Sequence, residues 1–197
     1  SNIQSRSIEL SLLLSLPASL GLILASEQIV NALFGYGSFT IENIKNTALA
    51  LEYFGYGIPA FALIKILSNF FFARNNTKTP FYISTFIVSL NLLISVTLFN
   101  KVGFIIIPIA TSASTWVGVI AYIYLLNNKN FLLIKNYLPN SILKIILSTV
   151  LMCFFLVLAL GQYVDYLDYD YKYKSIYLML IVCFVACIYL ISCYLSG

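Results

Sequence analysis

The chain has 197 residues, of which 61% are hydrophobic and 9% are charged, and its mean hydropathy is +0.95. Soluble domains carry about 25% charged residues, so this chain has too little polar surface to cover a water-soluble globule. The net charge of +4 is spread along the sequence without a basic block, which argues against a nucleic-acid partner. The composition predicts an integral membrane protein whose main partner is membrane lipid.

Six apolar segments are long enough, or nearly so, for a helix to cross the hydrocarbon layer, which takes about 20 residues. In chain order the predicted spans are 8–34, 47–73, 81–99, 102–126, 142–160 and 175–195. Their apolar runs do not alternate with polar residues as barrel strands do, and polar connections separate them. We predict an all-α bundle of six transmembrane helices, with four spans in residues 1–127 and a final helix hairpin in residues 128–197.

Six crossings place both termini on the same side of the membrane. On that side we count Arg6, Arg74, Lys78, Lys129, Lys135 and Lys144, and on the other side Lys45, Lys101, Lys172 and Lys174. Because positive charge favours the cytoplasmic side, we predict that both ends are cytoplasmic. The chain begins with Ser1 and has no signal-peptide pattern, so we expect that an upstream portion precedes it.

Polar side chains inside the spans are the candidate functional residues, because they are costly in lipid. Lys65 either extends its stem to the interface or faces a polar cavity. Asn91 and Ser95 lie one turn apart in the third span, and Thr111 belongs to a hydroxyl-rich stretch of the fourth. These groups either pack the helices together or form a polar path or cation site with oxygen ligands.

No catalytic pattern is found. The sequence has no histidine and no acid–base carboxylate pair, and it has no G-x-S-x-G and no phosphate-binding glycine loop. All four cysteines lie inside apolar runs and no CxxC occurs, which argues against a zinc site. We therefore expect neither an enzyme nor a metal centre.

Two segments resemble a known family. The run 33–40, LFGYGSFT, is similar to the "LF-x-[YR]G-x-F" segment of the MviN/MurJ family. Lys65 and the run 71–80, FFARNNTKTP, are similar to its "K … FY(A/S)R-x-D-x-(K/R)TP" segment. Members are lipid II flippases of the MOP exporter superfamily in the bacterial inner membrane. The resemblance implies helices nine to fourteen of a 14-helix, MOP/MATE-like transporter, which would need its missing N-terminal lobe to act.

The resemblance also implies roles for particular residues. Alternating access would carry the lipid-linked peptidoglycan precursor through a cationic cavity, for which the candidates are Lys65, Arg74 and Lys144. The final hairpin would form a groove for the lipid tail. Some relatives place a sodium ion in this lobe, at positions that match Asn91 and Thr111. Ser95 stands where they carry an acidic residue, which weakens the expectation of sodium, and no other cofactor is implied. The alternatives are a related polysaccharide or multidrug exporter and a non-transporting structural fragment.

Overall fold

The computed structural model describes residues 2–129, 131, 138–168 and 171–196. The described residues form helices and turns and contain no strand. In chain order the elements are α1 (Asn2–Leu24), α2 (Ser26–Phe34), α3 (Ile41–Gly55), α4 (Ile58–Phe72), α5 (Lys78–Val102), η1 (Gly103–Ile105), α6 (Ile106–Asn128), α7 (Leu138–Gln162), η2 (Val164–Leu167) and α8 (Lys174–Ser196). The prediction of an all-α membrane fold is confirmed.

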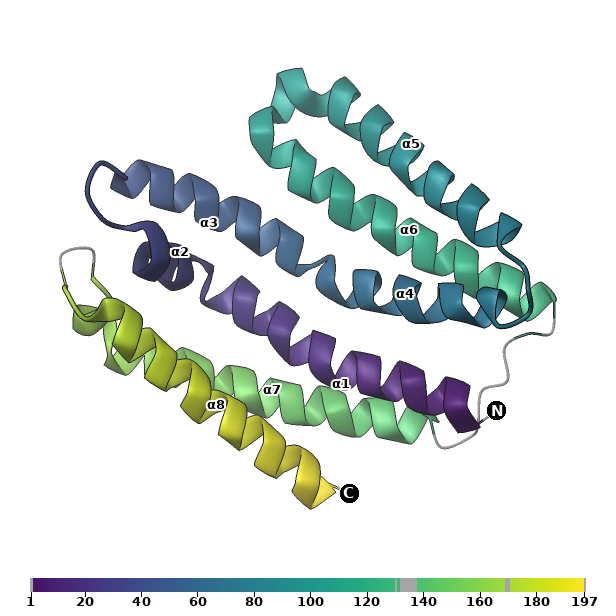
Figure 1. Cartoon of the computed structure of the whole chain (residues 1–197). Coiled ribbons are helices and arrows are strands. Elements are labelled where there is room, and N and C mark those ends of the chain that lie inside the picture. Colours follow the sequence, from purple (N-terminus) through teal and green to yellow (C-terminus); the bar gives the residue numbers. More distant parts are fainter. Residues whose placement is uncertain (1, 130, 132–137, 169–170, 197) are drawn as a thin grey trace.

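The long helices give six crossings. Five apolar stretches are long enough to span a membrane, and the one at Lys78–Asn128 contains both α5 and α6. Gly103 separates these two helices with a φ of 77°, a left-handed conformation that glycine adopts without strain. The chain reverses direction there, so α5 and α6 are two antiparallel crossings (Figure 1).

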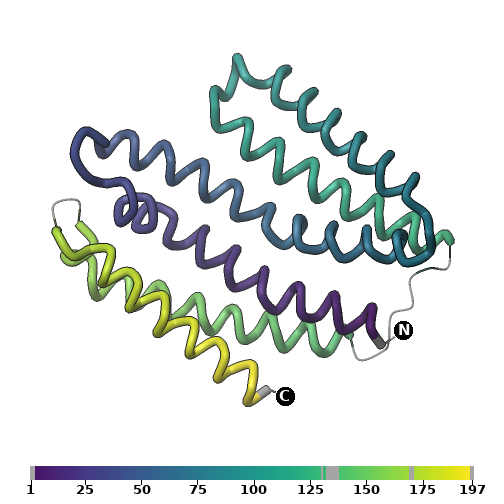
Figure 2. The backbone as a smooth tube through the Cα atoms, viewed as in Figure 1, coloured from purple at the N-terminus to yellow at the C-terminus, as the bar shows by residue number. Residues whose placement is uncertain are grey.

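The helices lie side by side in a row (Figure 1). Its order is α5, α6, the pair α3 and α4, then α1, α7 and α8, and each helix packs on its neighbour in this row. The central helix α1 packs on α3 and α4 on one side and on α7 on the other. Figure 2 shows α8 running back toward the end at which α1 begins, as expected for an even number of crossings. We call the opposite end, which holds α2, η2 and the start of α8, the distal end.

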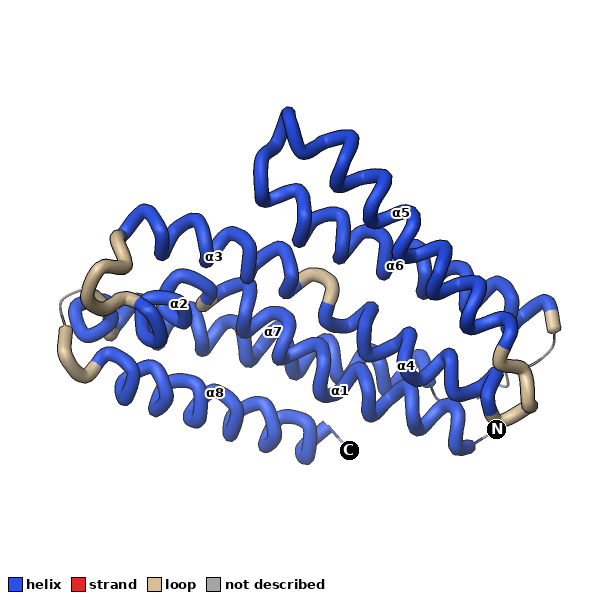
Figure 3. The backbone as a smooth tube through the Cα atoms, turned by 45° about the horizontal axis from the view of Figure 1, so that its top comes forward, coloured by secondary structure: helices blue, strands red, loops and turns tan. Residues whose placement is uncertain are grey.

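Two predicted spans are interrupted. Ala25 separates α1 from α2, so the first crossing ends at Leu24 and the short α2 is a separate element at the distal end. The second predicted span is two helices, because Tyr56 and Gly57 form a turn between α3 and α4 (Figure 3). The predicted spans ran through both breaks: apolar residues continue around Tyr56 and Gly57, whereas the first break is followed by the polar run 26–28.

Pro59 accounts for the break between α3 and α4. Its ring lacks an N–H and excludes the helical hydrogen bond to the carbonyl four residues earlier, which belongs to Gly55. That oxygen instead accepts a hydrogen bond from Ser19 Oγ of α1 at 2.7 Å. Because lipid offers no donors, a broken membrane helix needs such side-chain partners.

Two donors from α6 satisfy further carbonyls at the same break. Ser112 Oγ donates to the Tyr53 oxygen at 2.6 Å, and Trp116 Nε1 donates to the Tyr56 oxygen at 2.9 Å. The backbones also approach closely, since a Cβ on Gly57 would lie 3.2 Å from Ser112 Cα and 2.7 Å from Ser112 Oγ. The turn is therefore held from both sides, by α1 and by α6.

Candidate functional site

Lys174 at the start of α8 is completely buried, with 0% of its surface exposed. Its Nζ donates hydrogen bonds to Asn31 Oδ1 at 2.8 Å and to the Gly35 carbonyl at 2.6 Å. It also lies 4.2 Å from the centre of the Tyr36 ring, within range of a cation–π interaction. The ammonium thus sits at the C-terminal end of α2, where carbonyl groups and the helix dipole favour a cation.

The surrounding contacts join α2 to the final hairpin. Asn31 Nδ2 donates to the Leu167 carbonyl of η2 at 2.8 Å. Ser175 Oγ donates to the Ala32 carbonyl at 2.7 Å and lies 2.9 Å from the Tyr36 hydroxyl. We call this set of contacts the distal lock. Sequence reasoning missed it and counted Lys174 only as a loop charge.

The glycines of the LFGYGSFT segment have two separate structural reasons, one of which is the distal lock. A Cβ on Gly35 would overlap the side-chain oxygen of Asn31 and lie 2.9 Å from Lys174 Nζ. Gly37 has a φ of 65°, which disfavours any residue with a side chain. The backbone at Gly35 is therefore the part of the segment that binds the buried ammonium, and this glycine was the signal in the sequence that could have indicated a close approach.

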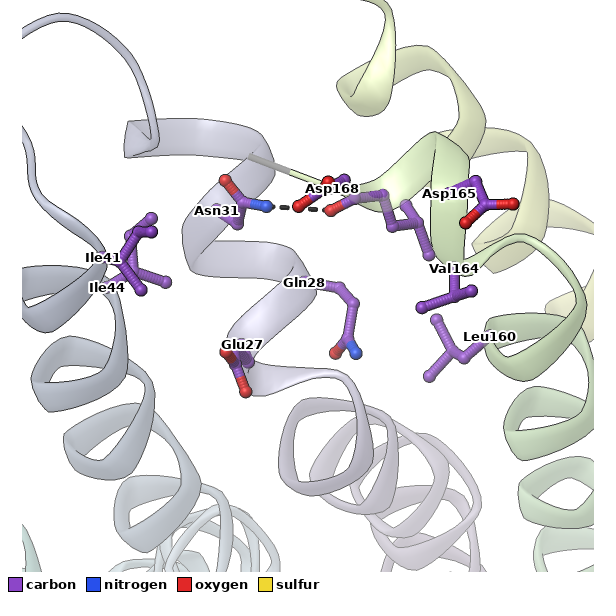
Figure 4. Close-up of a pocket in the computed structure, with 10 residues that line it drawn as sticks. Glu27, Gln28, Asn31, Ile41, Ile44, Leu160, Val164, Asp165 and Asp168 are labelled. Carbon is purple, nitrogen blue, oxygen red and sulfur yellow. Dashed lines mark hydrogen bonds between the residues drawn. The ribbon is translucent and has the colours of Figure 1, made fainter. Parts of the chain in front are cut away.

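A cavity of about 500 Å³ lies beside the distal lock, between α2, α3 and the end of α7 (Figure 4). Its polar lining consists of Glu27, Gln28, Asn31, Asp165 and Asp168, and its apolar lining includes Ile41, Ile44, Leu160 and Val164. Such a lining can accept hydrogen bonds from amines and hydroxyls. In the described part of the chain, no group of three or more His, Cys, Asp or Glu side chains is arranged to hold a metal ion.

Arg74, a predicted cavity residue, follows α4, and its side chain hydrogen-bonds to backbone carbonyls of this chain. Its guanidinium donates to the Phe70 carbonyl at 2.8 Å and to the Phe131 carbonyl at 3.1 Å. It also stacks 4.5 Å from the centre of the Phe131 ring. Gln4 of α1 donates to the same Phe131 oxygen at 3.1 Å. Arg74 therefore connects the end of α4 to the segment after α6, next to the start of α1.

The other two predicted cavity cations are exposed. Lys65 lies on α4 and Lys144 on α7. The helix α1 lies between α4 and α7, so Lys65 and Lys144 lie on helices that are not neighbours in the row (Figure 1). Lys135, which was counted in the predicted charge bias, lies outside the described residues.

The predicted cation-site residues do come together. Asn91 Nδ2 donates to Thr111 Oγ1 at 2.9 Å, and Ser95 Oγ donates to Asn91 Oδ1 at 3.3 Å. These contacts join α5 to α6. The three side chains are neutral and hydrogen-bonded to one another.

A second hollow lies along the final hairpin. It has a volume of about 490 Å³ and is lined by Phe155, Leu158, Ala159, Gln162, Tyr163, Tyr177, Leu180, Ile181 and Phe184 of α7, its C-terminal end and α8. At its distal end the rings of Tyr166 and Tyr177 stack with centroids 4.6 Å apart. The groove is apolar along its length and aromatic at the level where tyrosines favour the membrane interface.

Comparison with known proteins identifies one family and several of its members as similar to this chain. The model of the family described as "Lipid II flippase MurJ" matches residues 1–179. The "Probable lipid II flippase MurJ" of Rickettsia prowazekii (strain Madrid E) is 35% identical over 170 residues, which are 86% of this chain and 33% of that protein. Its counterpart in Thermotoga maritima is 33% identical over 178 residues, which are 90% of this chain and 35% of that protein.

A solved structure, "Lipid II flippase MurJ, inward closed conformation", has the same fold, with a TM-score of 0.79 at 23% sequence identity. The match covers 96% of this chain and 37% of that one. The chain thus spans about a third of the length of the curated relatives it matches.

The fold and its apolar crossings define an all-α, multi-pass membrane protein. The two sequence segments that resemble the family, residues 33–40 and 71–80, lie at the distal lock and around Arg74. The chain belongs to the MurJ family of lipid II flippases.

Proposed function

We propose that this chain supplies the C-terminal helices of a lipid II flippase, which moves the undecaprenyl-linked peptidoglycan precursor across the bacterial inner membrane by alternating access. The observation that carries the proposal is the family match over residues 1–179. Because the chain spans about a third of its relatives, it acts in this proposal together with an N-terminal lobe. Its role is transport and involves no covalent chemistry.

Two cations are assigned to the headgroup path. Lys65 and Lys144 are exposed on α4 and α7, so each can meet an anionic group outside this lobe. Arg74 receives a different role, since its guanidinium already binds two carbonyls of the lobe. We assign Arg74 to holding the end of α4 in place. The bias of positive residues toward the end at which α1 begins supports an orientation with both ends cytoplasmic.

The groove between α7 and α8 is assigned to the polyisoprenyl tail. An apolar groove about 490 Å³ in volume suits a hydrocarbon chain, which needs no hydrogen-bond partners. Ala159→Trp would fill the groove and should reduce labelling by a photoreactive polyisoprenyl phosphate. Leu143→Trp, on the same helix outside the groove, is the matched control. Equal labelling of both variants would contradict this assignment.

The test of transport is complementation. This segment is fused to the N-terminal lobe of an authentic flippase, and the chimera is expressed in a strain depleted of its own lipid II flippase. We expect rescue, and we expect Lys65→Ala or Lys144→Ala to reduce it at unchanged chimera abundance. Lys101→Ala, at the end of α5, is the control. A well-expressed chimera that fails to rescue contradicts the proposed function, whereas rescue unaffected by both lysine variants would contradict only their assignment.

A further inference from the structure

The contact between α5 and α6 has a polar centre. The helix α5 makes few contacts with other elements. The buried residues of α5 are Pro80 and Ile83, both in its first two turns, and it packs mainly on α6. Further along the helix, Asn91 and Ser95 meet Thr111 of α6. In lipid these oxygens and the amide nitrogen need partners, which either a bound cation or the side chains themselves can provide.

The direction of each hydrogen bond follows from the number of protons. Thr111 Oγ1 has one proton and donates it to the Ile107 carbonyl at 2.8 Å. Toward Asn91 it can therefore only accept, and the amide nitrogen of Asn91 donates to it. The Asn91 oxygen then accepts from Ser95 Oγ. If the amide were turned over, the Thr111 hydroxyl would have to turn away from the Ile107 carbonyl to donate to the Asn91 oxygen.

This order of bonds leaves no place for a cation. The Asn91 nitrogen, which carries partial positive charge, lies 2.9 Å from the Thr111 oxygen and would repel a cation there. Neither α5 nor α6 supplies a carboxylate to offset the cost of desolvating a cation, because residues 53–164 contain neither Asp nor Glu. The side-chain oxygens that predict a cation site from sequence thus take part in hydrogen bonds within the protein.

We propose that Asn91, Ser95 and Thr111 form a neutral clasp that holds α5 on α6 without sodium. The inference concerns the folded lobe and does not depend on the proposed transport function. It makes Asn91 the central residue of the clasp, since its amide contacts both of the other side chains.

The experiment is thermal unfolding of the purified full chain in detergent, in NaCl, KCl and choline chloride at equal ionic strength. We expect the same midpoint in all three salts. A cation site filled at a hundred times its dissociation constant would instead raise the midpoint by roughly 5–10 °C in the cognate salt. A midpoint of the unmodified chain that is specifically higher in NaCl would overturn the proposal.

Variants make the test decisive even if one of them folds poorly. Asn91→Leu and Thr111→Val should lower the midpoint by the same amount in all three salts, because they remove hydrogen bonds and no ion. A loss confined to NaCl would count against the clasp. Ser95→Asp supplies the missing carboxylate and should make the midpoint sodium-dependent, whereas the neutral Ser95→Asn should not.

Discussion

The hydroxyl of Tyr189 in α8 donates a 2.7 Å hydrogen bond to the carbonyl oxygen of Leu13 in α1. Leu13 lies four residues before Pro17, which has no N–H to offer that oxygen. The proline thus frees a carbonyl inside the membrane, and a side chain from the last helix satisfies it. Pro59 and Ser19 repeat this relationship at the Gly55 carbonyl. In both cases a proline in one helix specifies a contact with another.

Tyr189→Phe should therefore destabilise the chain through the Leu13 carbonyl. We expect a loss of about 1 kcal/mol in unfolding free energy, which is typical of hydrogen bonds between membrane helices. In a Pro17→Ala background the restored N–H can bond that oxygen, so the same substitution should cost less. Denaturation in mixed detergent micelles measures both values. Tyr194→Phe, at an exposed position of α8, is the control, and equal costs in the two backgrounds would refute the coupling.

Gly57→Ala should be destabilising because the new methyl group meets Ser112 Oγ. Overpacking of this kind costs about 1–3 kcal/mol. Gly21→Ala is the matched control, since nothing lies within 4 Å of its added Cβ, and it should gain roughly 0.5–1 kcal/mol as a helical glycine replacement. Ser112→Ala removes the nearest obstacle, so its combination with Gly57→Ala should cost less than the sum of the two. Melting temperatures of the four variants would show this, and strict additivity would count against it.

Lys174→Met should open the distal lock. It removes two charge-assisted hydrogen bonds, and we expect a loss of about 2 kcal/mol in unfolding free energy. Lys172→Met changes the same charge at an exposed position two residues earlier and should have little effect. Proteolysis of the segment before α8 provides a local readout, which should accelerate for Lys174→Met alone. Similar behaviour of the two variants would mean that the buried ammonium does not hold the hairpin.

Arg74→Lys should behave as a structural substitution although it keeps the charge. A lysine cannot bridge the Phe70 and Phe131 carbonyls with a planar fork while it stacks on the Phe131 ring. We expect the free energy of unfolding to fall by about 1–2 kcal/mol. Lys65→Ala should stay within about 0.5 kcal/mol because Lys65 is exposed. Thermal unfolding in detergent compares them, and a stable Arg74→Lys variant would return Arg74 to the candidate substrate residues.

Several of these contacts leave a partial trace in the sequence. Pro17 and Pro59 can be read as points where a helical carbonyl loses its partner, and Gly35 and Gly37 as positions that disfavour a side chain. What cannot be read is the identity of the donors. Asn31 and Lys174 are 143 residues apart, and no local pattern states that they meet. Asn91, Ser95 and Thr111 were predicted together, yet the sequence left open whether hydrogen bonds or a cation join them.

The sequence by itself determined that this chain is helical, crosses the membrane six times and carries no catalytic pattern. The physical reason is that hydrocarbon forces each apolar segment to satisfy its own backbone, so segment length and polarity suffice. Only the tertiary structure decided where the spans break, why Lys174 is buried and that Arg74 binds carbonyls. Those outcomes depend on which helices become neighbours, and a side chain's partners are set by packing across the whole chain.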